Sequence, residues 1–274
     1  MSDVKAYEIN GYVISDVGKV RAANEDNYLI GNSINENSEG HTEAELDIGN
    51  VVRWNCFAVY DGIGGAERGE IASKYAAEEM KNAIVDIEPD FTYEAVDNII
   101  SATYLSANNR IVNARSEMAV TGTTGTALVT DGIMAKVYHI GDSRAYLLRD
   151  NELYLLTSDQ TMAQMKIDIG FCKDISEADP KDIHQLTEYI GRDTSGQYFH
   201  PVEGEWIDFR IDDVFLICSD GVYDECNTAQ IKSVLSQKEL TVKQRVQRLY
   251  GLSMFKGAKD NVTCMIVEKT QLKD

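Results

Sequence analysis

Three aspartates stand at the ends of apolar runs that have the character of buried strands. Asp61 follows residues 56–60, Asp220 follows residues 214–219, and Asp260 comes just ahead of the apolar run 264–267. Carboxylates at strand ends, next to glycines that let backbone carbonyls approach, build oxygen-only sites for hard divalent cations. The three positions are too far apart for one local loop, so the tertiary fold must assemble any such site.

The alternative for each Asp-Gly pair is a simple hairpin turn, which this dipeptide favours. Asp131-Gly132 joins two alternating runs, 126–130 and 133–137, and is predicted to be such a turn. Asp61 differs because it opens a loop rich in glycine, 61–65, that is followed by a helical pattern. Taken alone, Asp61 fits either a turn or a metal ligand.

The composition favours one domain covering residues 1–274. Hydrophobic residues make up 43% of the chain, and only 3 prolines occur, with no linker-like stretch. The polar, acidic segment 31–49 is predicted to be an exposed loop insertion between strands. No apolar run approaches the length of a membrane span.

The net charge of −19 argues against nucleic acid or an anionic membrane as the main partner, because both require a basic surface. The first residues lack the pattern of a secretion signal. The cysteines are odd in number and lack the paired spacing of metal sites. We therefore expect a reducing, cytoplasmic environment.

Hydrophobic periodicity divides the chain into strands and two groups of helices. Alternation predicts strands at 7–15, 27–30, 54–60, 124–130, 133–140, 144–148, 153–157, 206–211, 214–218 and 262–268. Spacings of three and four predict helices at 67–86, 93–115, 228–236 and 241–254. Strand hairpins with helices grouped between them predict an α+β fold, with sheets inside and helices outside.

Six short motifs follow one another along the chain. They are Arg21-Ala22-Ala23-Asn24-Glu25-Asp26, Asp61-Gly62-Ile63-Gly64-Gly65, Gly122-Thr123-Thr124, Gly141-Asp142-Ser143-Arg144, Ser219-Asp220-Gly221 and Asp260-Asn261-Val262-Thr263. In this order they closely resemble the metal-dependent protein serine/threonine phosphatases of the PP2C type (PPM family), particularly the bacterial form. The resemblance extends from about residue 11 to residue 267.

The resemblance implies a four-layer α-β-β-α sandwich with two central antiparallel sheets, and a flap subdomain at 161–191 beside a metal-containing cleft. It implies two Mn²⁺ or Mg²⁺ ions, with Asp61 bridging both. The other protein ligands would be the Gly62 carbonyl, Asp220 and Asp260.

Further residues take supporting roles in the same resemblance. Asp26 would contact the metals through bound water, with Glu25 and Asn261 supporting the ligands. Asp142 and Asp220 resemble the positions that hold a third, weaker metal in bacterial members.

The implied reaction is hydrolysis of phosphoserine and phosphothreonine by a hydroxide that bridges the two metals, a species that metal coordination makes accessible near neutral pH. Asp61 and Arg21 would be the catalytic residues. Arg21 offers a planar fork that grips two phosphate oxygens. Its alternative role is a surface arginine paired with Glu25 or Asp26.

The chain also departs from the family pattern. Many members carry a histidine, the candidate general acid, where this chain has Ile63 and Ala66. We therefore expect a metal-bound water to protonate the leaving group. His139 is predicted to be a packed strand residue, and His41, His184 and His200 have no motif support. The stretch 179–184 is unusual, because relatives often have a His-Pro pair there.

Two other readings stay open at this level. The chain is either an active phosphatase or a catalytically silent member of the fold that serves as a regulatory or binding module. An active enzyme is either broad or dedicated to one phosphoprotein. The expected partners are Ser/Thr-phosphorylated proteins, with a cognate protein kinase as a further candidate, and the expected state is a monomer.

Overall fold

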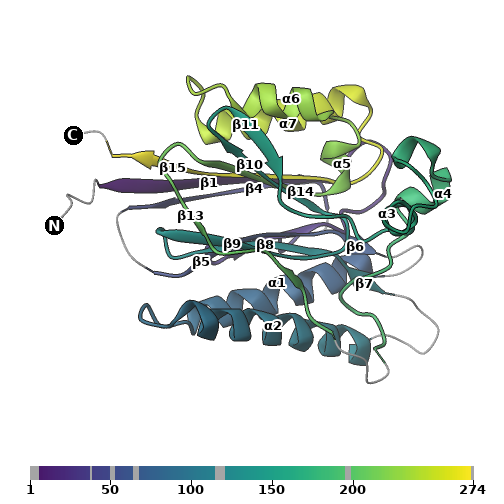
Figure 1. Cartoon of the computed structure of the whole chain (residues 1–274), viewed down its shortest axis with the longest axis horizontal. Helices are drawn as coiled ribbons and strands as arrows, with labels where there is room; N and C mark the ends of the chain where they lie inside the picture. The colour runs from purple at the N-terminus through teal and green to yellow at the C-terminus, as the bar shows by residue number, and fades with distance from the viewer. Residues whose placement is uncertain are drawn as a thin grey trace.

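Two antiparallel β-sheets stack face to face, and helices cover both outer faces (Figure 1). The computed structural model describes residues 6–37, 39–49, 53–63, 68–114, 121–194 and 199–272. The arrangement of four layers confirms the α+β sandwich that the sequence predicts.

The first sheet has six strands in the order β11-β10-β14-β15-β1-β4. Their bounds in that order are Glu152–Leu155, Arg144–Arg149, Val214–Cys218, Val262–Gln271, Tyr7–Asp16 and His41–Ile48. Each neighbouring pair in this sheet is antiparallel.

The second sheet has the order β12-β9-β8-β5-β2-β3, with β13 also pairing with β9. The bounds are β12 Val202–Glu203, β9 Met134–Ile140, β8 Gly125–Thr130, β5 Asn55–Tyr60, β2 Asn27–Ile30, β3 Ser33–Ile34 and β13 Ile207–Asp208. A small separate pair joins β6 (Gly62–Ile63) to β7 (Gly122–Thr123).

The central strand β14 is apolar throughout because each of its two faces meets a different part of the core. In β14, Phe215 and Ile217 join the cluster between the two sheets, whereas Leu216 and Cys218 join the cluster under the helices. Successive side chains of a strand point to opposite faces, so a strand buried on both faces is continuously apolar.

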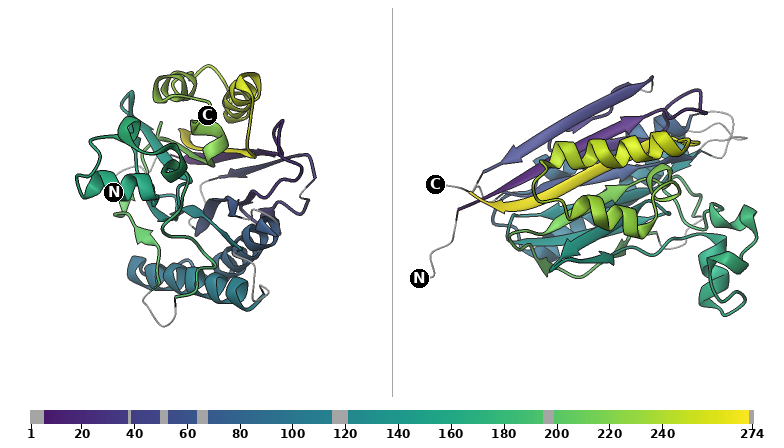
Figure 2. Two further views of the ribbon diagram at one scale, coloured as in Figure 1. Left: turned by 90° about the vertical axis from the view of Figure 1, so that its right-hand side faces the viewer. Right: turned by 90° about the horizontal axis from the view of Figure 1, so that it is seen from above.

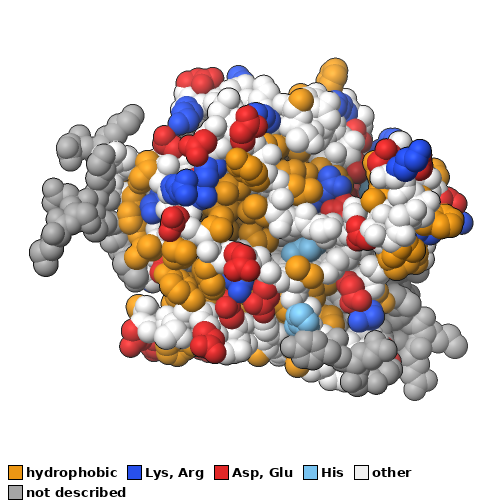
Figure 3. Space-filling view, in the orientation of Figure 1, with side chains coloured by type: hydrophobic (Ala, Val, Ile, Leu, Met, Phe, Trp, Pro, Cys, Tyr) orange, Lys and Arg blue, Asp and Glu red, His pale blue; other side chains and the backbone are white. Residues whose placement is uncertain are grey.

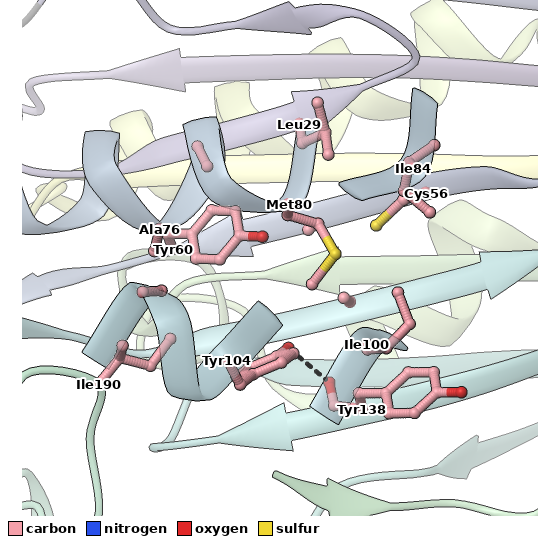
Figure 4. Close-up of a cluster of buried hydrophobic side chains, with 14 of the residues drawn as sticks. Leu29, Cys56, Tyr60, Ala76, Met80, Ile84, Ile100, Tyr104, Tyr138 and Ile190 are labelled. Carbon is pink, nitrogen blue, oxygen red and sulfur yellow. Dashed lines mark hydrogen bonds between the residues drawn. The ribbon is translucent and has the colours of Figure 1, made fainter. Parts of the chain in front are cut away.

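Helices α1 (Gly69–Val85) and α2 (Tyr93–Ala114) cover the second sheet. Figure 4 shows Met80 of α1 and Ile100 of α2 pointing toward the strands, in a core that also contains Tyr60. The hydroxyl of Tyr104 donates to the Tyr138 carbonyl at 3.4 Å, so the buried phenol is satisfied. Helices α5 (Asp220–Tyr223), α6 (Thr228–Leu235) and α7 (Val242–Lys256) cover the first sheet.

Two hairpins have tight turns, and the one predicted at Asp131-Gly132 is confirmed. In the hairpin between β10 and β11, Asp150 and Asn151 both have positive φ, 52° and 63°, as a two-residue turn requires. The carboxylate of Asp131 accepts from the backbone N–H groups of Ile133 and Met134, each at 2.8 Å, in the hairpin between β8 and β9. Asp131 is therefore a turn residue.

The prediction of an exposed loop at 31–49 is wrong, because this segment contains β3 and the eight-residue strand β4. β4 pairs with β1 at the edge of the first sheet. Exposed side chains, among them Glu43 and Asp47, alternate along it with half-buried ones such as Leu46. Acidic residues have low strand propensity, which hid this pattern, and charge on an edge strand discourages pairing with other chains.

The strand predicted at 206–211 is shorter than expected and covers only β13. Asp212 has a positive φ of 70°, and the Asp213 carboxylate accepts from the Arg210 N–H at 2.7 Å, so this segment turns instead of extending. Among the residues that the structure describes, no helix is both long and apolar enough to cross a membrane. All five cysteines are buried and unpaired.

Residues 161–191 project from one end of the sandwich (Figures 1 and 2). They contain α3 (Met162–Asp168), the short 3₁₀ helix η1 (Ile175–Glu177) and α4 (Pro180–Ile183). The lobe exposes apolar side chains, including Ile169 and Phe171, and Figure 3 shows hydrophobic surface on it.

Candidate metal centre

Five aspartates meet at the end of the sandwich from which this lobe projects. Asp26 precedes β2, Asp61 follows β5, Asp142 follows β9, Asp220 opens α5 directly after β14, and Asp260 precedes β15. All except Asp26 line one cleft of about 900 Å³. The cleft is also lined by Arg21, Glu25, Gly62, Thr124 and His184.

The backbone of Asp61 is held by the two threonines of the Gly122-Thr123-Thr124 motif. Its N–H donates to Thr124 Oγ1 at 2.9 Å, and its carbonyl accepts from the Thr124 N–H at 2.8 Å and from Thr123 Oγ1 at 2.9 Å. No residue within the described ranges donates a hydrogen bond to the Asp61 carboxylate. The fold therefore fixes the position of Asp61 and leaves its carboxylate free for a ligand.

Gly62 lies where only glycine fits. A Cβ atom at this position would come within 2.5 Å of both the Glu25 and the Gly69 carbonyl oxygens. The backbone therefore approaches the cleft closely, as a carbonyl ligand requires. Residues 64–67, including Ala66, lie outside the described part of the chain.

Asp26 is 2% exposed, and its two carboxylate oxygens differ. Oδ2 accepts from Ser219 Oγ at 2.8 Å and from Thr263 Oγ1 at 2.7 Å. Oδ1 is buried and has no hydrogen-bond partner among the described residues. A buried oxygen without a donor is costly unless a cation or a water binds it, so Asp26 fits a site next to metals.

Asn261 fastens the segment that carries Arg21 and Glu25. Its Oδ1 accepts from the Glu25 N–H at 2.8 Å, and its Nδ2 donates to the carbonyls of Val17 and Ala23 at 3.0 and 2.9 Å. The amide thus makes three hydrogen bonds across more than 230 residues of sequence. Of the two supporting residues that the resemblance implies, Glu25 lines the cleft and Asn261 holds the backbone of Glu25 in place.

Arg21 lies in the cleft and not on an outer surface. Its Nη2 is 2.6 Å from Asp260 Oδ2, so its acidic partner is neither Glu25 nor Asp26. The side chain remains 49% exposed. The other guanidinium nitrogens form no hydrogen bond within the described ranges, which leaves them available to an anion.

Burial and mutual repulsion raise the pKa values of the carboxyl groups in the cluster. Burial raises the pKa of Asp26 to about 7 and that of Asp142 to about 8, and the neighbouring carboxylates add to both effects. Burial and the same repulsion raise the pKa of Asp61 and of Asp220. Such groups ionise readily only when positive charge enters. An all-oxygen donor set with buried, unpartnered oxygens therefore fits Mn²⁺ or Mg²⁺.

His184, which no sequence motif singled out, follows α4 and faces the cluster. Its Nδ1 is 3.4 Å from Asp220 Oδ2 and 4.0 Å from Asp142 Oδ2, and its Nε2 is 3.2 Å from Asp224 Oδ2. The carboxylates of Asp220 and Asp224 raise the pKa of this imidazole to about 10. The sequence does mark the stretch 179–184 as unusual, but it does not indicate which residues His184 contacts.

His139 is a packed strand residue, as predicted. It is 2% exposed, its Nδ1 is 2.9 Å from Thr126 Oγ1, and its Nε2 donates to the Ser158 carbonyl at 3.1 Å. Burial lowers the pKa of this imidazole to about 4.

Comparison with known proteins decides the family. The family model described as protein phosphatase 2C matches residues 10–166, which is more than half of the chain. The chain belongs to the protein phosphatase 2C family. The five aspartates, gathered from across the sequence and four of them in the cleft, are thus the acidic cluster of a PP2C chain.

Two curated relatives give the extent of the similarity. The PP2C chain is 31% identical over 259 residues to the serine/threonine protein phosphatase PstP of Mycobacterium tuberculosis, covering 93% of this chain and 44% of PstP. It thus spans less than half the length of that relative. It is 27% identical to the serine/threonine phosphatase stp of Listeria innocua, over 94% of this chain and 95% of that protein.

One solved structure is informative about metals. The catalytic domain of PstP in complex with two manganese ions superposes with a TM-score of 0.71 at 28% identity. The match covers 96% of this chain and 99% of that domain. The sandwich and its two sheets are therefore the PP2C fold.

Proposed function

We propose that this PP2C chain is a metal-dependent protein phosphatase that hydrolyses phosphoserine and phosphothreonine. One observation carries the proposal: Asp61, Asp142, Asp220 and Asp260 line one cleft next to Asp26, and buried oxygens of Asp26 and Asp220 have no hydrogen-bond partner among the described residues. A protein of net charge −19 accepts a phosphorylated substrate only if cations reverse the field locally.

In this proposal Asp61, the Gly62 carbonyl, Asp220 and Asp260 would hold two Mn²⁺ or Mg²⁺ ions, and Asp26 would support them. When bound, such ions lower the pKa of water and neutralise charge on a phosphoryl group. Asp142 and Asp220 are the candidates for a third, weaker ion.

Arg21 binds the substrate phosphate. Its ion pair with Asp260 occupies Nη2 and orients the guanidinium, and the remaining donors face the open cleft. A planar guanidinium holds two phosphate oxygens at once, which an ammonium does not. Asn261 keeps Arg21 in place by fastening the backbone at Val17 and Ala23.

The proposed function extends to the domain organisation, the partners and the location of the chain. Residues 1–274 form one phosphatase domain, and 161–191 act as its flap. The partners are Ser/Thr-phosphorylated proteins and a cognate protein kinase, with the chain acting as a cytoplasmic monomer. Five unpaired cysteines support a reducing location.

The test is hydrolysis of a phosphothreonine peptide by protein stripped with chelator and then supplied with Mn²⁺ or Mg²⁺. We expect no turnover in chelator and recovery with either metal. Full turnover in excess chelator contradicts the metal-dependent mechanism. Mn²⁺ binding without any turnover would instead identify a silent binding module.

A further inference from the structure

A nitrogen ligand lies beside the two aspartates assigned above to a third cation. His184 Nδ1, one oxygen of Asp142 and one oxygen of Asp220 all lie within 4.8 Å of one another. Ligands bound about 2.1 Å from one ion are separated by roughly 3 to 4.3 Å. The contacts of Nδ1 with Asp220 (3.4 Å) and Asp142 (4.0 Å) fall within that range.

The Asp142 carboxylate supplies an independent sign that a ligand belongs here. Asp142 is only 5% exposed, yet no residue in the described ranges donates a hydrogen bond to its carboxylate. Tyr223 donates to the backbone carbonyl of Asp142 at 3.1 Å and fixes the main chain. A carboxylate this buried and without donors is costly unless a cation or a water binds it.

Asp224 orients the imidazole for ligation. Its Oδ2 lies 3.2 Å from His184 Nε2, within reach of an N–H···O hydrogen bond. A histidine that binds metal through one ring nitrogen commonly donates the other to a carboxylate, which fixes the tautomer. With Nε2–H directed to Asp224, Nδ1 is the ring atom that faces Asp142 and Asp220, and it becomes a ligand when a cation displaces its proton.

Hydrogen bonds of the backbone fix the position of His184 relative to Asp142. Gln160 bonds Gly141 twice: its N–H donates to the Gly141 carbonyl at 2.8 Å, and its Oε1 accepts from the Gly141 N–H at 2.7 Å. The Gln160 carbonyl accepts from the Thr187 N–H at 2.8 Å, and Met162 N–H donates to Gln185 O at 2.8 Å. The segment that carries His184 is thus tied to the loop that carries Asp142.

We propose that His184 Nδ1, Asp142 and Asp220 form a mixed nitrogen–oxygen site that selects Mn²⁺ and later first-row divalent ions over Mg²⁺. Mg²⁺ prefers oxygen ligands and retains its waters, whereas imidazole suits transition metals. This site lies beside the two metal positions with oxygen ligands in the proposed phosphatase. It rests on the proposed function only for the presence of those two neighbouring ions.

The direct test is pulsed EPR on the full chain, labelled with ¹⁵N-histidine and loaded with Mn²⁺. We expect a histidine nitrogen coupling to Mn²⁺ in the wild type and in a His41→Gln control, and its loss in His184→Gln. His41 pairs with Asp16 away from the cleft. Absence of the coupling in the wild type, or its persistence in His184→Gln, overturns the proposal.

Calorimetric titration gives the second readout. His184→Gln is expected to weaken binding of the last Mn²⁺ by about 10- to 100-fold and to change Mg²⁺ binding less than threefold. Asp224→Asn should weaken the same Mn²⁺ by about tenfold. Equal losses for Mn²⁺ and Mg²⁺ would overturn the selectivity. Neither readout needs turnover, so an inactive protein with the nitrogen coupling would refute the phosphatase proposal alone.

Discussion

Two Asp-Gly pairs in this chain differ in what their carboxylates bind. Both oxygens of Asp131 already have partners, because Oδ1 accepts two backbone N–H groups of its own hairpin and Oδ2 accepts the Tyr93 hydroxyl of α2 at 3.0 Å. Asp61 is held only through its backbone. The dipeptide does not determine its role, whereas the hydrogen bonds of the side chain do.

Arg21→Ala is expected to raise KM for phosphopeptides about 10- to 150-fold with a smaller loss of kcat. A guanidinium on nonbridging oxygens binds ground and transition states alike, at about 1.5–3 kcal/mol. Steady-state kinetics measure both constants. Arg110→Ala is the control, because Arg110 pairs with Glu78 and Glu79 on the helices. An unchanged KM in Arg21→Ala would remove the phosphate role.

His139 gives a pH dependence of stability. Burial lowers its pKa from 6.5 to about 4, so the native state binds fewer protons than the unfolded chain between these values. Stability from His139 is present above pH 6.5 and is lost as the pH falls toward 4. At about 1.4 kcal/mol per pH unit, the loss between pH 7 and pH 5 is about 2 kcal/mol.

Urea unfolding of metal-free protein at these two pH values measures this loss. His139→Gln removes the titrating group and should lower the pH dependence by that amount. The comparison cancels the contribution of the cleft aspartates, which both proteins share. Identical pH dependence in the variant and the wild type would contradict a neutral, buried His139.

At the scale of elements, burial on both faces made most strands predictable. β14 and the strand β5 appear in the sequence as continuous apolar runs, and the structure places them at their predicted positions within one residue. β4 was missed because it lies at a sheet edge, where only one face is partly buried and acidic residues alternate. Hydrophobic patterns report burial, so an exposed edge strand leaves little trace.

Substituting two glycines tests the packing between α5 and the turn before β15, with Gly251 of α7 as the control. A Cβ on Gly221 would lie 2.0 Å from the Asn261 carbonyl, whereas a Cβ on Gly251 in α7 meets nothing within 4 Å. Gly221→Ala should therefore destabilise the protein by about 1–3 kcal/mol or more and weaken Mn²⁺ binding. Gly251→Ala should stabilise it by up to about 1 kcal/mol.

Thermal unfolding with and without Mn²⁺ measures both effects. The two substitutions add the same methyl group, so their difference isolates the contact with Asn261. Equal stability of the two variants would show that the close approach of α5 to Asn261 does not constrain the site.

At the scale of the whole molecule, the centre collects residues from Arg21 to Asp260 at one end of two sheets. The aspartates were predictable because each occupies a motif at a strand end. The position of His184 was not predictable, because its contact with Asp142 depends on how residues 161–191 fold back against the cleft. No local sequence spacing determines that arrangement. The fold also explains how an acidic protein concentrates carboxylates in one cleft, where cations would offset their repulsion.

The most direct test of the account is the turnover of Asp61→Asn beside that of Asp131→Asn, on one phosphothreonine peptide at saturating Mn²⁺. Both variants change an aspartate that precedes glycine. We predict that Asp61→Asn lowers kcat by several orders of magnitude and keeps or raises stability in chelator, because one repelling charge is lost. Asp131→Asn should keep near-normal turnover. Near-normal turnover in Asp61→Asn would contradict the central claim that Asp61 organises the metals of a phosphatase.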